Sequence, residues 1–372
     1  SYLEASLAVA PLTLLHFHRF SLIALPANLL AAPLAVALLY ASLATAVLDV
    51  FFAPLAPAGG WICGIVAEAL RSLAHYAAAN DPDWRGPAPP LALLMGLTGL
   101  AAGRGWSRRV LPLAGLVASL SLSSLPRGDG RLHLWFLDVG QGDSVVIETP
   151  AGSAAVIDAG PSFERFDSGE RVVGEALWRL GHRRVAFLGV THRHNDHEGG
   201  APFLARHFDP ERVYVNGESK ALRDFSPKIV RRGDAWILDG VTFRVLGPDS
   251  AWTLPRADEN ARSLVVEVSW GVTSFLLMGD ATRLTEGLLD IPRRRYELVK
   301  VGHHGAATSS SDRLVRDARP RLAVISVGDR NRFAHPAGEV VARWAGAGAL
   351  VWRTDIHRTL HVASDGKRIE WQ

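Results

Sequence analysis

Hydrophobic residues are arranged in two different ways along the 372-residue chain. Up to about residue 125 they form long stretches without a formal charge, at 20–48, 50–67, 86–103 and 110–126. A helix that crosses a bilayer needs about 20 apolar residues, with a range of about 17–25. The pattern therefore predicts two or three membrane helices. The alternative is a set of buried core helices in a water-soluble protein, and four such stretches in so short a segment argue against it.

The longest apolar stretch contains residues that interrupt helices, namely Pro26, Asn28 and Pro33. Proline removes a backbone donor, and unpaired backbone groups are costly in lipid unless they face protein or water. The stretch is therefore either a broken segment that lines a polar path or a helix with a simple proline kink.

From about residue 131 the pattern changes to short β-rich runs that alternate with helical ones. Strands are predicted within 132–139, 143–148, 154–160, 185–191, 242–248, 263–269, 273–280, 296–305, 321–328 and 349–355. Helices are predicted within 170–180, 200–207, 282–290, 310–318 and 337–346, and Gly181 is a stop signal. This order predicts sheets covered by helices in a sandwich.

Charge changes at the same point. Residues 1–125 contain 6 basic and 5 acidic residues, whereas residues 126–372 contain 34 basic and 32 acidic ones. Such a change indicates a change of solvent, from lipid to water. The chain opens with Ser1 inside an apolar run, so we expect its natural N-terminus to lie upstream. The single Cys63 excludes an intramolecular disulfide.

Basic residues between the apolar stretches bear on orientation. Arg104, Arg108 and Arg109 form the most basic short connection. The positive-inside tendency places this loop in the cytoplasm. One further crossing by 110–126 then puts the polar half on the extracytoplasmic side.

The strongest chemical feature is the sequence Thr-His-Arg-His-Asn-Asp-His at 191–197, which directly follows a predicted strand. It brings His192, His194, Asp196 and His197 onto one loop. Imidazole and carboxylate groups are the ligands that Zn, Mn or Fe prefer. A solvated turn would not usually gather three histidines and an aspartate at this spacing.

Two weaker features follow in order. Gly279-Asp280 ends an apolar strand, and Gly302-His303-His304-Gly305 ends a later one. Each alone is typical of a turn or a helix cap. After the first motif, they supply the Asp and His that a second metal needs.

Together, HxHxDH, GD and HHG resemble the metallo-β-lactamase superfamily. The segments DVGQGDS at 138–144, LVKVGHHG at 298–305 and SVGDRNRFAHP at 326–336 are similar to ComEC-type DNA-uptake proteins. Residues 14–34 also resemble the end of that family's membrane competence domain.

This resemblance implies an all-α transmembrane segment followed by an α/β domain with an αββα sandwich. Residues 1–127 would be the end of a membrane-embedded channel domain, and 128–372 a hydrolase domain. The implied location is the inner or plasma membrane, with several membrane passes. The implied partners are the lipid bilayer, single-stranded or duplex DNA, and proteins of the competence machinery.

The family pattern also assigns site residues. It puts His192 and His194 on one metal and Asp196 and His197 on the other, with Asp280 as a bridge and His303 completing the second site. Proton transfer or contact with the substrate phosphate falls to Asp196, His304 and His335. Asp158 would orient the ligand loop, and further supporting or substrate-binding positions are Gln141, Asp143, Asn260, Arg330 and Arg332.

One departure concerns the metals. Superfamily members usually supply another histidine between the ligand loop and GD, but here that interval contains only His207, which we expect to be a surface or packing residue. Asp143, Asp258 or Asn260 could replace it. The site is expected to hold two divalent ions, Zn or Mn, or only one of them tightly.

Three functions remain open. The first is a DNA-uptake channel with a metal-dependent nuclease domain that degrades the strand not imported. The second is the same channel with a hydrolase-like domain that does not cut, and the third is a membrane-anchored hydrolase of another ester or amide. Phosphate contacts are conceivable for Arg293–Arg295, Arg231–Arg232 and Arg330 with Arg332, although a solvated charged surface is the alternative for each.

Overall fold

The computed structural model describes residues 19–21, 23–80, 84–85, 128–251 and 258–372. The chain separates into two compact units, Ser1–Ser124 and Leu125–Gln372, which are described separately. The apolar stretches 86–103 and 110–126 lie outside the described residues, as does the basic loop at 104–109. The predicted boundary after residue 127 falls at the edge of the described region.

The first unit contains two long apolar helices, α2 (Ala24–Phe51) and α3 (Ala56–Ala79), joined by the 3₁₀ turn η1 (Ala53–Leu55). By length and composition both could cross a membrane, and their side chains are exposed. Helix α2 runs through Pro33 without a break, so of the two alternatives for this stretch a helix that contains the proline is observed, and a broken segment is not. Beside the two helices, the two-residue strand β1 (Arg19–Phe20) pairs with β2 (Trp84–Arg85).

The second unit contains two sheets. The first has eight strands in the order β10-β9-β8-β5-β4-β3-β18-β19, and the second has seven in the order β11-β12-β13-β14-β15-β16-β17. The strands of the first sheet are β3 (Leu132–Phe136), β4 (Val145–Glu148), β5 (Ala154–Ile157), β8 (Phe187–Val190), β9 (Arg212–Val215), β10 (Lys228–Ile229), β18 (Leu360–Ser364) and β19 (Ile369–Trp371). Those of the second are β11 (Ala235–Leu238), β12 (Val241–Gly247), β13 (Val265–Trp270), β14 (Thr273–Leu277), β15 (Leu298–Lys300), β16 (Leu322–Ile325) and β17 (Leu350–Arg353).

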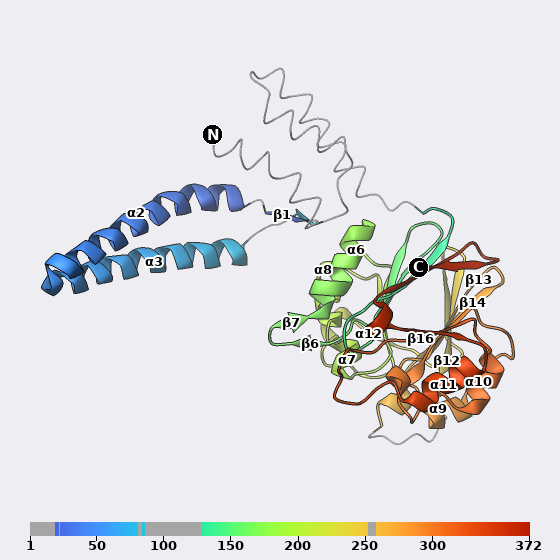
Figure 1. Ribbon diagram of the computed structural model, residues 1–372. Coiled ribbons are helices and arrows are strands. Elements are labelled where there is room, and N and C mark those ends of the chain that lie inside the picture. The colour runs from blue at the N-terminus through green and yellow to red at the C-terminus, as the bar shows by residue number, and fades with distance from the viewer. Residues whose placement is uncertain (1–18, 22, 81–83, 86–127, 252–257) are drawn as a thin grey trace, which may run out of the picture. The chain divides into compact units, whose positions relative to one another are not determined.

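Helices cover the outer face of each sheet (Figure 1). Helices α6 (Glu175–Leu180) and α8 (Ala201–His207) pack on the first sheet. Helices α10 (Asp312–Ala318) and α11 (Gly338–Gly346) pack on the second, next to α9 (Arg283–Leu288). The predicted αββα sandwich is confirmed. The predicted stop at Gly181 is also seen, because this residue ends α6 with φ 95°, a conformation that favours glycine.

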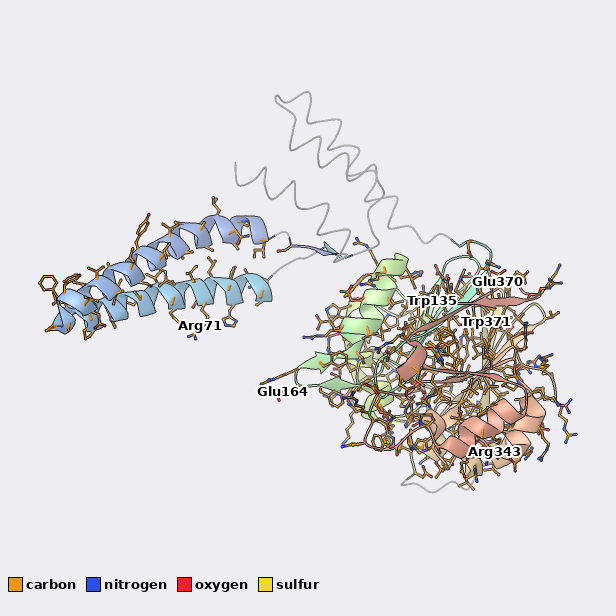
Figure 2. All side chains as sticks on the ribbon, in the orientation of Figure 1. Arg71, Trp135, Glu164, Arg343, Glu370 and Trp371 are labelled. Atoms are coloured by element: carbon orange, nitrogen blue, oxygen red, sulfur yellow. The ribbon has the colours of Figure 1, made fainter. Side chains whose placement is uncertain are left out.

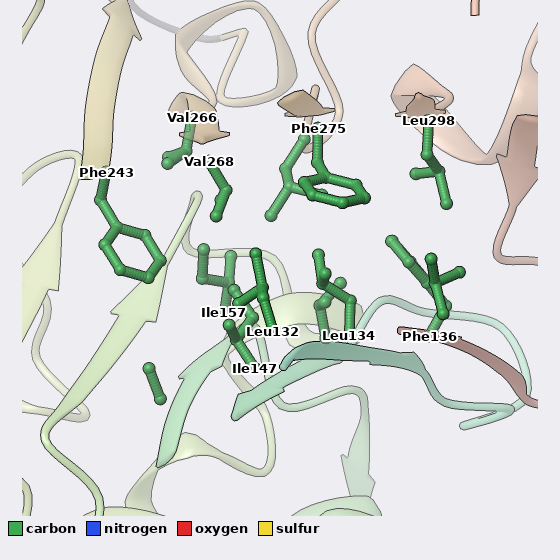
Figure 3. Packing of buried hydrophobic residues seen from close by; sticks show 14 of the residues in the cluster. Leu132, Leu134, Phe136, Ile147, Ile157, Phe243, Val266, Val268, Phe275 and Leu298 are labelled. Atoms are coloured by element: carbon green, nitrogen blue, oxygen red, sulfur yellow. The ribbon is translucent and has the colours of Figure 1, made fainter. Parts of the chain in front are cut away.

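The central core lies between the two sheets (Figure 3). Alternate residues of β3, Leu132, Leu134 and Phe136, are fully buried and face Phe275 and Leu298 of the other sheet. This period of two is the signature of a strand with one face in a core. Burying a large apolar side chain contributes about 1.5–3 kcal/mol, so this layer is a main source of the domain's stability.

Parallel pairing decides where the functional loops emerge. Strands β5, β8 and β9 are parallel in the first sheet, and β14, β15 and β16 are parallel in the second. The loops that follow β5, β8, β14, β15 and β16 therefore leave their sheets at the carboxyl ends of the strands. These loops carry most of the predicted site residues, while Gln141 and Asp143 lie between β3 and β4 and Asn260 lies between β12 and β13.

Candidate metal centre

The ligand loop begins where β8 ends and continues into α7 (Asn195–Glu198). Asp158, which follows β5, holds this loop. One of its carboxylate oxygens accepts a hydrogen bond from the Thr191 backbone N–H at 2.7 Å. The other contacts Thr191 Oγ1 at 2.8 Å and His197 Nδ1 at 2.8 Å. Asp158 thus fixes the ring orientation of His197, as carboxylates behind metal-ligating histidines do.

Four side chains converge at one point, namely Asp196, His197, Asp280 and His304. The ligand atoms that they offer all lie within 4.8 Å of one another. His197 Nε2 is 3.2 Å from Asp280 Oδ1, and His304 Nε2 is 3.3 Å from Asp196 Oδ2. On the far side of His304, Nδ1 lies 2.8 Å from the carbonyl oxygen of Ser326, which leaves Nε2 free to face the cluster.

The donor atoms of this cluster fit a metal ion. Among the described residues, His197 Nε2, Asp280 Oδ1 and His304 Nε2 are buried without a hydrogen-bond partner. Buried polar atoms are rarely left without a hydrogen bond, so three of them aimed at one point fit a set of metal ligands. Two imidazoles and two carboxylates are a ligand set suited to Zn or Mn.

The charges of the cluster favour a cation. Burial raises the pKa of Asp280, but His304 and His197 outweigh this effect and hold that pKa well below its usual range. Burial lowers the pKa of His197, but Asp280 and Asp158 bring it well above the usual value, so the ring holds a proton that a bound metal ion would displace. His304 and His197 likewise overcome burial and lower the pKa of Asp196 to about 2. The carboxylates are therefore anionic at neutral pH, as metal ligands must be.

The two histidines of the HHG motif differ from their expected places. Sequence analysis gave the ligand position to His303 and a proton-transfer role to His304. The structure brings His304 into the cluster, whereas His303 Nε2 lies 2.9 Å from Asn260 Nδ2 and His303 Nδ1 lies 3.0 Å from Thr308 Oγ1. Both histidines have positive φ, 53° and 51°. Such turns cost of order 1–3 kcal/mol each and often occur at functional sites. We therefore propose to exchange the two assignments.

The predicted first metal position is less complete. His192 Nε2 lies 3.1 Å from His194 Nδ1 and 3.8 Å from Asp280 Oδ2. Burial and the neighbouring His197 lower the pKa of His192 well below its usual value, so its ring is neutral and able to ligate. His207 does not join them, because its ring stacks on Phe203 on the exposed side of α8.

The three residues considered as substitutes for the missing histidine have other contacts. Asp258 accepts the backbone N–H of Ala261 at 2.9 Å, and Asn260 contacts His303. Asp143 is buried and forms an ion pair with Lys300. These contacts favour one complete position beside a partial one.

Lys300 was not singled out from the sequence. It is the last residue of β15, fully buried, and it also donates to the carbonyl oxygen of Gly279 at 3.1 Å. Its carboxylate partner Asp143 lies 3.5 Å from His304 Nδ1 and 3.7 Å from His197 Nδ1. The ion pair therefore supports the cluster from behind. The only signal in the sequence is a lysine within an apolar strand.

The cluster opens into a cavity of about 680 Å³. Asp280, His304 and Asp196 line it together with further residues, namely Gln141, Phe163, His194, Asn195, Asn260, His303, Asn331, Arg332, Phe333 and His335. Sequence analysis had not singled out Phe163, Asn331 or Phe333. Arg330 points elsewhere and pairs with Asp329 at 3.8 Å, with most of its side chain exposed.

The other basic segments lie apart from this cavity. Arg293–Arg295 line a separate cavity with Arg316 and Arg319, before the start of β15 and β16, at the opposite ends of these strands from the cluster. Arg231 donates to the carbonyl oxygen of Asn216, and Arg232 lies 3.7 Å from Asp249. Of the predicted phosphate contacts, only Arg332 lies beside the cluster.

Two family models match the chain. Residues 137–329 match the metallo-beta-lactamase superfamily, and residues 2–109 match the model described as competence protein. The first match includes all four converging residues.

Curated relatives match both parts. The chain is 28% identical to ComE operon protein 3 of Bacillus subtilis over 96% of its length and 50% of the relative's. It is 31% identical to competence protein ComA of Neisseria gonorrhoeae over 83% of its length and 43% of the relative's. The chain thus spans half or less of these relatives. Among solved structures, Igni18, a metallo hydrolase from the archaeon Ignicoccus hospitalis, is 13% identical with a TM-score of 0.36, covering 62% of this chain and 98% of its own.

Proposed function

The chain belongs to the metallo-β-lactamase superfamily and is of the ComEC competence type, and from this premise we propose that its hydrolase domain cleaves DNA phosphodiesters in a metal-dependent reaction. In this proposal the membrane part helps single-stranded DNA to pass, and the hydrolase domain degrades the strand that is not imported. Proteins of the competence machinery would be its partners.

The observation that carries the catalytic part is the set of unpaired ligand atoms at the floor of an open cavity. His197 Nε2, Asp280 Oδ1 and His304 Nε2 are buried and unpartnered among the described residues, while Asp196 beside them is partly exposed to the cavity. A structural metal site is usually closed by protein ligands, whereas a catalytic one keeps a position open to substrate. This arrangement therefore favours catalysis over a purely structural role.

Divalent ions in such sites act as Lewis acids on phosphoryl oxygens and lower the pKa of water. The chain's own residues would bind and orient the diester around them. Asp196 is anionic, since its pKa is about 2, so it cannot donate a proton at neutral pH and is suited to bind a cation. Burial, with His303 and His304 nearby, lowers the pKa of His335, so this ring is neutral at pH 7. A neutral His335 is better suited to donate a hydrogen bond to phosphate than to act as an acid.

The choice of DNA rests on the competence resemblance and on Arg332. The guanidinium of Arg332 lines the cavity, where it could pair with a phosphate next to the one that is cut. Together, these features favour a nucleic-acid diester over an amide or an uncharged ester. The metals would be Zn or Mn, with the position around His197 and His304 held more tightly than the one around His192 and His194.

For location, we propose several membrane passes and an extracytoplasmic hydrolase domain. Helices α2 and α3 supply two candidate spans. The basic loop at 104–109 favours the cytoplasmic side by the positive-inside tendency, which would place the hydrolase domain on the other side. An extracytoplasmic nuclease would meet incoming DNA before it crosses the membrane.

A cleavage assay on the detergent-solubilised chain tests the activity. Labelled single-stranded and duplex DNA would be incubated with Mn²⁺, Zn²⁺ or Mg²⁺ and the products separated by size. Wild-type chain should cleave, and Asp280→Asn and His197→Ala should reduce cleavage by at least about 10³-fold, because residues that act as a unit fail together. His192→Ala should retain measurable activity at raised metal concentration if the position around His197 carries catalysis.

Glu370→Gln is a matched control for Asp280→Asn, since it removes an exposed carboxylate on β19 (Figure 2). DNA binding without cleavage under all metal conditions would instead support a channel with a non-catalytic domain. Cleavage of a carboxylic ester or amide but of no phosphodiester would support the third function. Wild-type-like DNA cleavage by folded, metal-depleted Asp280→Asn would contradict the metallo-nuclease assignment.

A further inference from the structure

Two exposed phenyl rings flank the cavity that holds the metal cluster. Phe163 is 65% exposed and Phe333 is 49% exposed, and both line this cavity with Asp280 and His304. Single exposed apolar side chains are common on protein surfaces, but two of them around the cavity that holds the metal cluster indicate a binding role. Neither ring belongs to the metal ligands.

The first ring is held in place relative to the ligand loop. Phe163 ends β6 (Ser162–Phe163), which forms a hairpin with β7 (Phe166–Asp167). The Ser162 backbone N–H donates to Asn195 Oδ1 at 3.4 Å, and Ser162 Oγ donates to Asp167 Oδ2 at 3.0 Å. Glu164, next to Phe163 at the turn, projects outward from the body of the domain (Figure 2). The hairpin, which follows β5, thus presents Phe163 next to the loop after β8 that carries Asp196.

The second ring comes from the other sheet. Phe333 lies in the loop after β16, which Asn331 braces by donating to the carbonyl oxygens of Gly328 at 3.0 Å and His335 at 2.7 Å. The Arg332 guanidinium lies 4.9 Å from the Phe333 ring centroid. The centroid of the His335 ring lies 5.7 Å from that of the Phe333 ring, and the two ring planes make an angle of 23°. The guanidinium therefore lies over the Phe333 ring and the imidazole stacks with it, so a base that stacks on Phe333 would take the place of Arg332 as this side chain turns to a phosphate.

A strand of nucleic acid alternates flat bases with anionic phosphates, and this alternation matches the cavity. The cluster with Arg332 suits phosphates, while Phe163 and Phe333 suit base faces. Bases stack on aromatic side chains without regard to sequence, because every base has a π face. In a duplex these faces are covered by neighbouring bases, so only an unpaired strand presents them without the cost of unstacking.

We infer that Phe163 and Phe333 are base-stacking positions on either side of the metal cluster, and that the site accepts unpaired nucleotides rather than duplex DNA. This inference rests on the proposed function and adds to it the strandedness of the substrate and two specificity-determining residues. Stacking on one aromatic ring changes affinity by roughly 5-fold to 100-fold when the ring is removed.

The test uses the full chain in detergent and three substrates. These are a single-stranded oligonucleotide, the same oligonucleotide with abasic sites in place of the bases, and methyl p-nitrophenyl phosphate as a diester without a base. Phe163→Ala and Phe333→Ala should each raise KM for the intact oligonucleotide by roughly 5-fold to 100-fold. They should leave kinetics on the abasic oligonucleotide and the small diester near wild type. Phe163→Trp and Phe333→Trp keep an aromatic ring, so they should retain the wild-type preference for the oligonucleotide with bases over the abasic one.

Trp371→Ala is the matched control, since this half-exposed aromatic ring also has an arginine beside it, Arg321 at 5.5 Å, but lies on β19 at the edge of its sheet. If wild type cleaves the intact and abasic oligonucleotides equally, or if the alanine variants cut both like wild type, the rings do not bind bases and the inference fails. Lipid contact would then be the remaining role for them. If wild type cleaves none of the three substrates, the proposed function fails instead.

Discussion

The buried carboxylates around the cluster differ in the residues that balance their negative charge. Three carboxylates are almost fully buried and lie within 4 Å of a ring nitrogen of His197. They are Asp143 at 3.7 Å, Asp158 at 2.8 Å and Asp280 at 3.2 Å. Isolated carboxylates in such surroundings are very costly unless they are paired or bind a cation. Lys300 pairs with Asp143, whereas Asp280 faces imidazoles and a second carboxylate, that of Asp196. This difference makes Asp280 the carboxylate with the greatest need of a metal.

His304 and His303 give opposite predictions for metal binding. His304→Ala should weaken Mn²⁺ or Zn²⁺ binding by more than about tenfold, because even residues behind the ligands cost that much. His303→Ala should retain the metal, since its ring contacts Asn260 and Thr308. Metal content after dialysis of the folded variants measures both effects. Loss of metal from His303→Ala alone would return the ligand role to His303.

Lys300→Met should destabilise the hydrolase domain strongly. The change removes the positive partner of buried Asp143, and breaking a buried ion pair on one side costs about 3–5 kcal/mol. Adding Asp143→Asn should recover most of that loss, because no unpaired charge then remains. Urea unfolding of the solubilised chain, followed by tryptophan fluorescence, measures the free energies. Lys220→Met, at an exposed lysine, is the control, and equal stability of both single variants would refute the charge argument.

At the scale of elements, the site depends on where strands end. The alternation of strands and helices from residue 132 onward predicts the sandwich, and the placement of HxHxDH, GD and HHG directly after strands predicts their meeting. Strands β9, β10, β11, β18 and β19 were not predicted. Strand β18 pairs with β3, which lies more than 220 residues earlier in the chain. Local pattern cannot specify such distant partners, nor the positive φ angles that turn His304 inward and His303 aside.

One glycine in the loop between β3 and β4 tests how the loops are packed together. Gly142 has φ 155°, and a Cβ there would lie 2.5 Å from the carbonyl oxygen of Asp196. Gly142→Ala should therefore displace Asp196 and lower metal affinity by roughly 10–100-fold, as changes behind metal ligands do. Isothermal titration with Mn²⁺ measures this.

Gly140→Ala is the control in the same loop. Gly140 also has a positive φ, 77°, but a Cβ there meets no atom within 4 Å. The substitution Gly140→Ala therefore adds backbone strain without a steric clash. Equal metal affinity of the two variants would show that the close approach to Asp196 does not matter.

At the scale of the whole molecule, the two units place their apolar side chains differently. The hydrolase domain buries three apolar cores of its own, all within residues 132–369. Helices α2 and α3 instead expose large apolar side chains, such as Leu29, Tyr40 and Trp61. The composition change near residue 125 predicts this division, because water and lipid select different surfaces. The boundary after residue 127 stays a prediction, and the stretches beyond α3 lie outside the described residues.

Cys63, the chain's single cysteine, reports whether α3 lies in a bilayer. Helix α3 spans Ala56–Ala79, so at 1.5 Å per residue Cys63 lies about 7 Å from the helix midpoint. The hydrocarbon layer extends about 15 Å to each side of its centre. In intact membranes a water-soluble maleimide should therefore leave Cys63 unmodified, and it should react after denaturation in detergent. A Lys220→Cys, Cys63→Ser variant, with its cysteine on the exposed surface of the hydrolase domain, should react in opened vesicles without denaturation. If Cys63 reacts as fast as that control before denaturation, α3 does not span the membrane, and its apolar surface must be covered by protein instead.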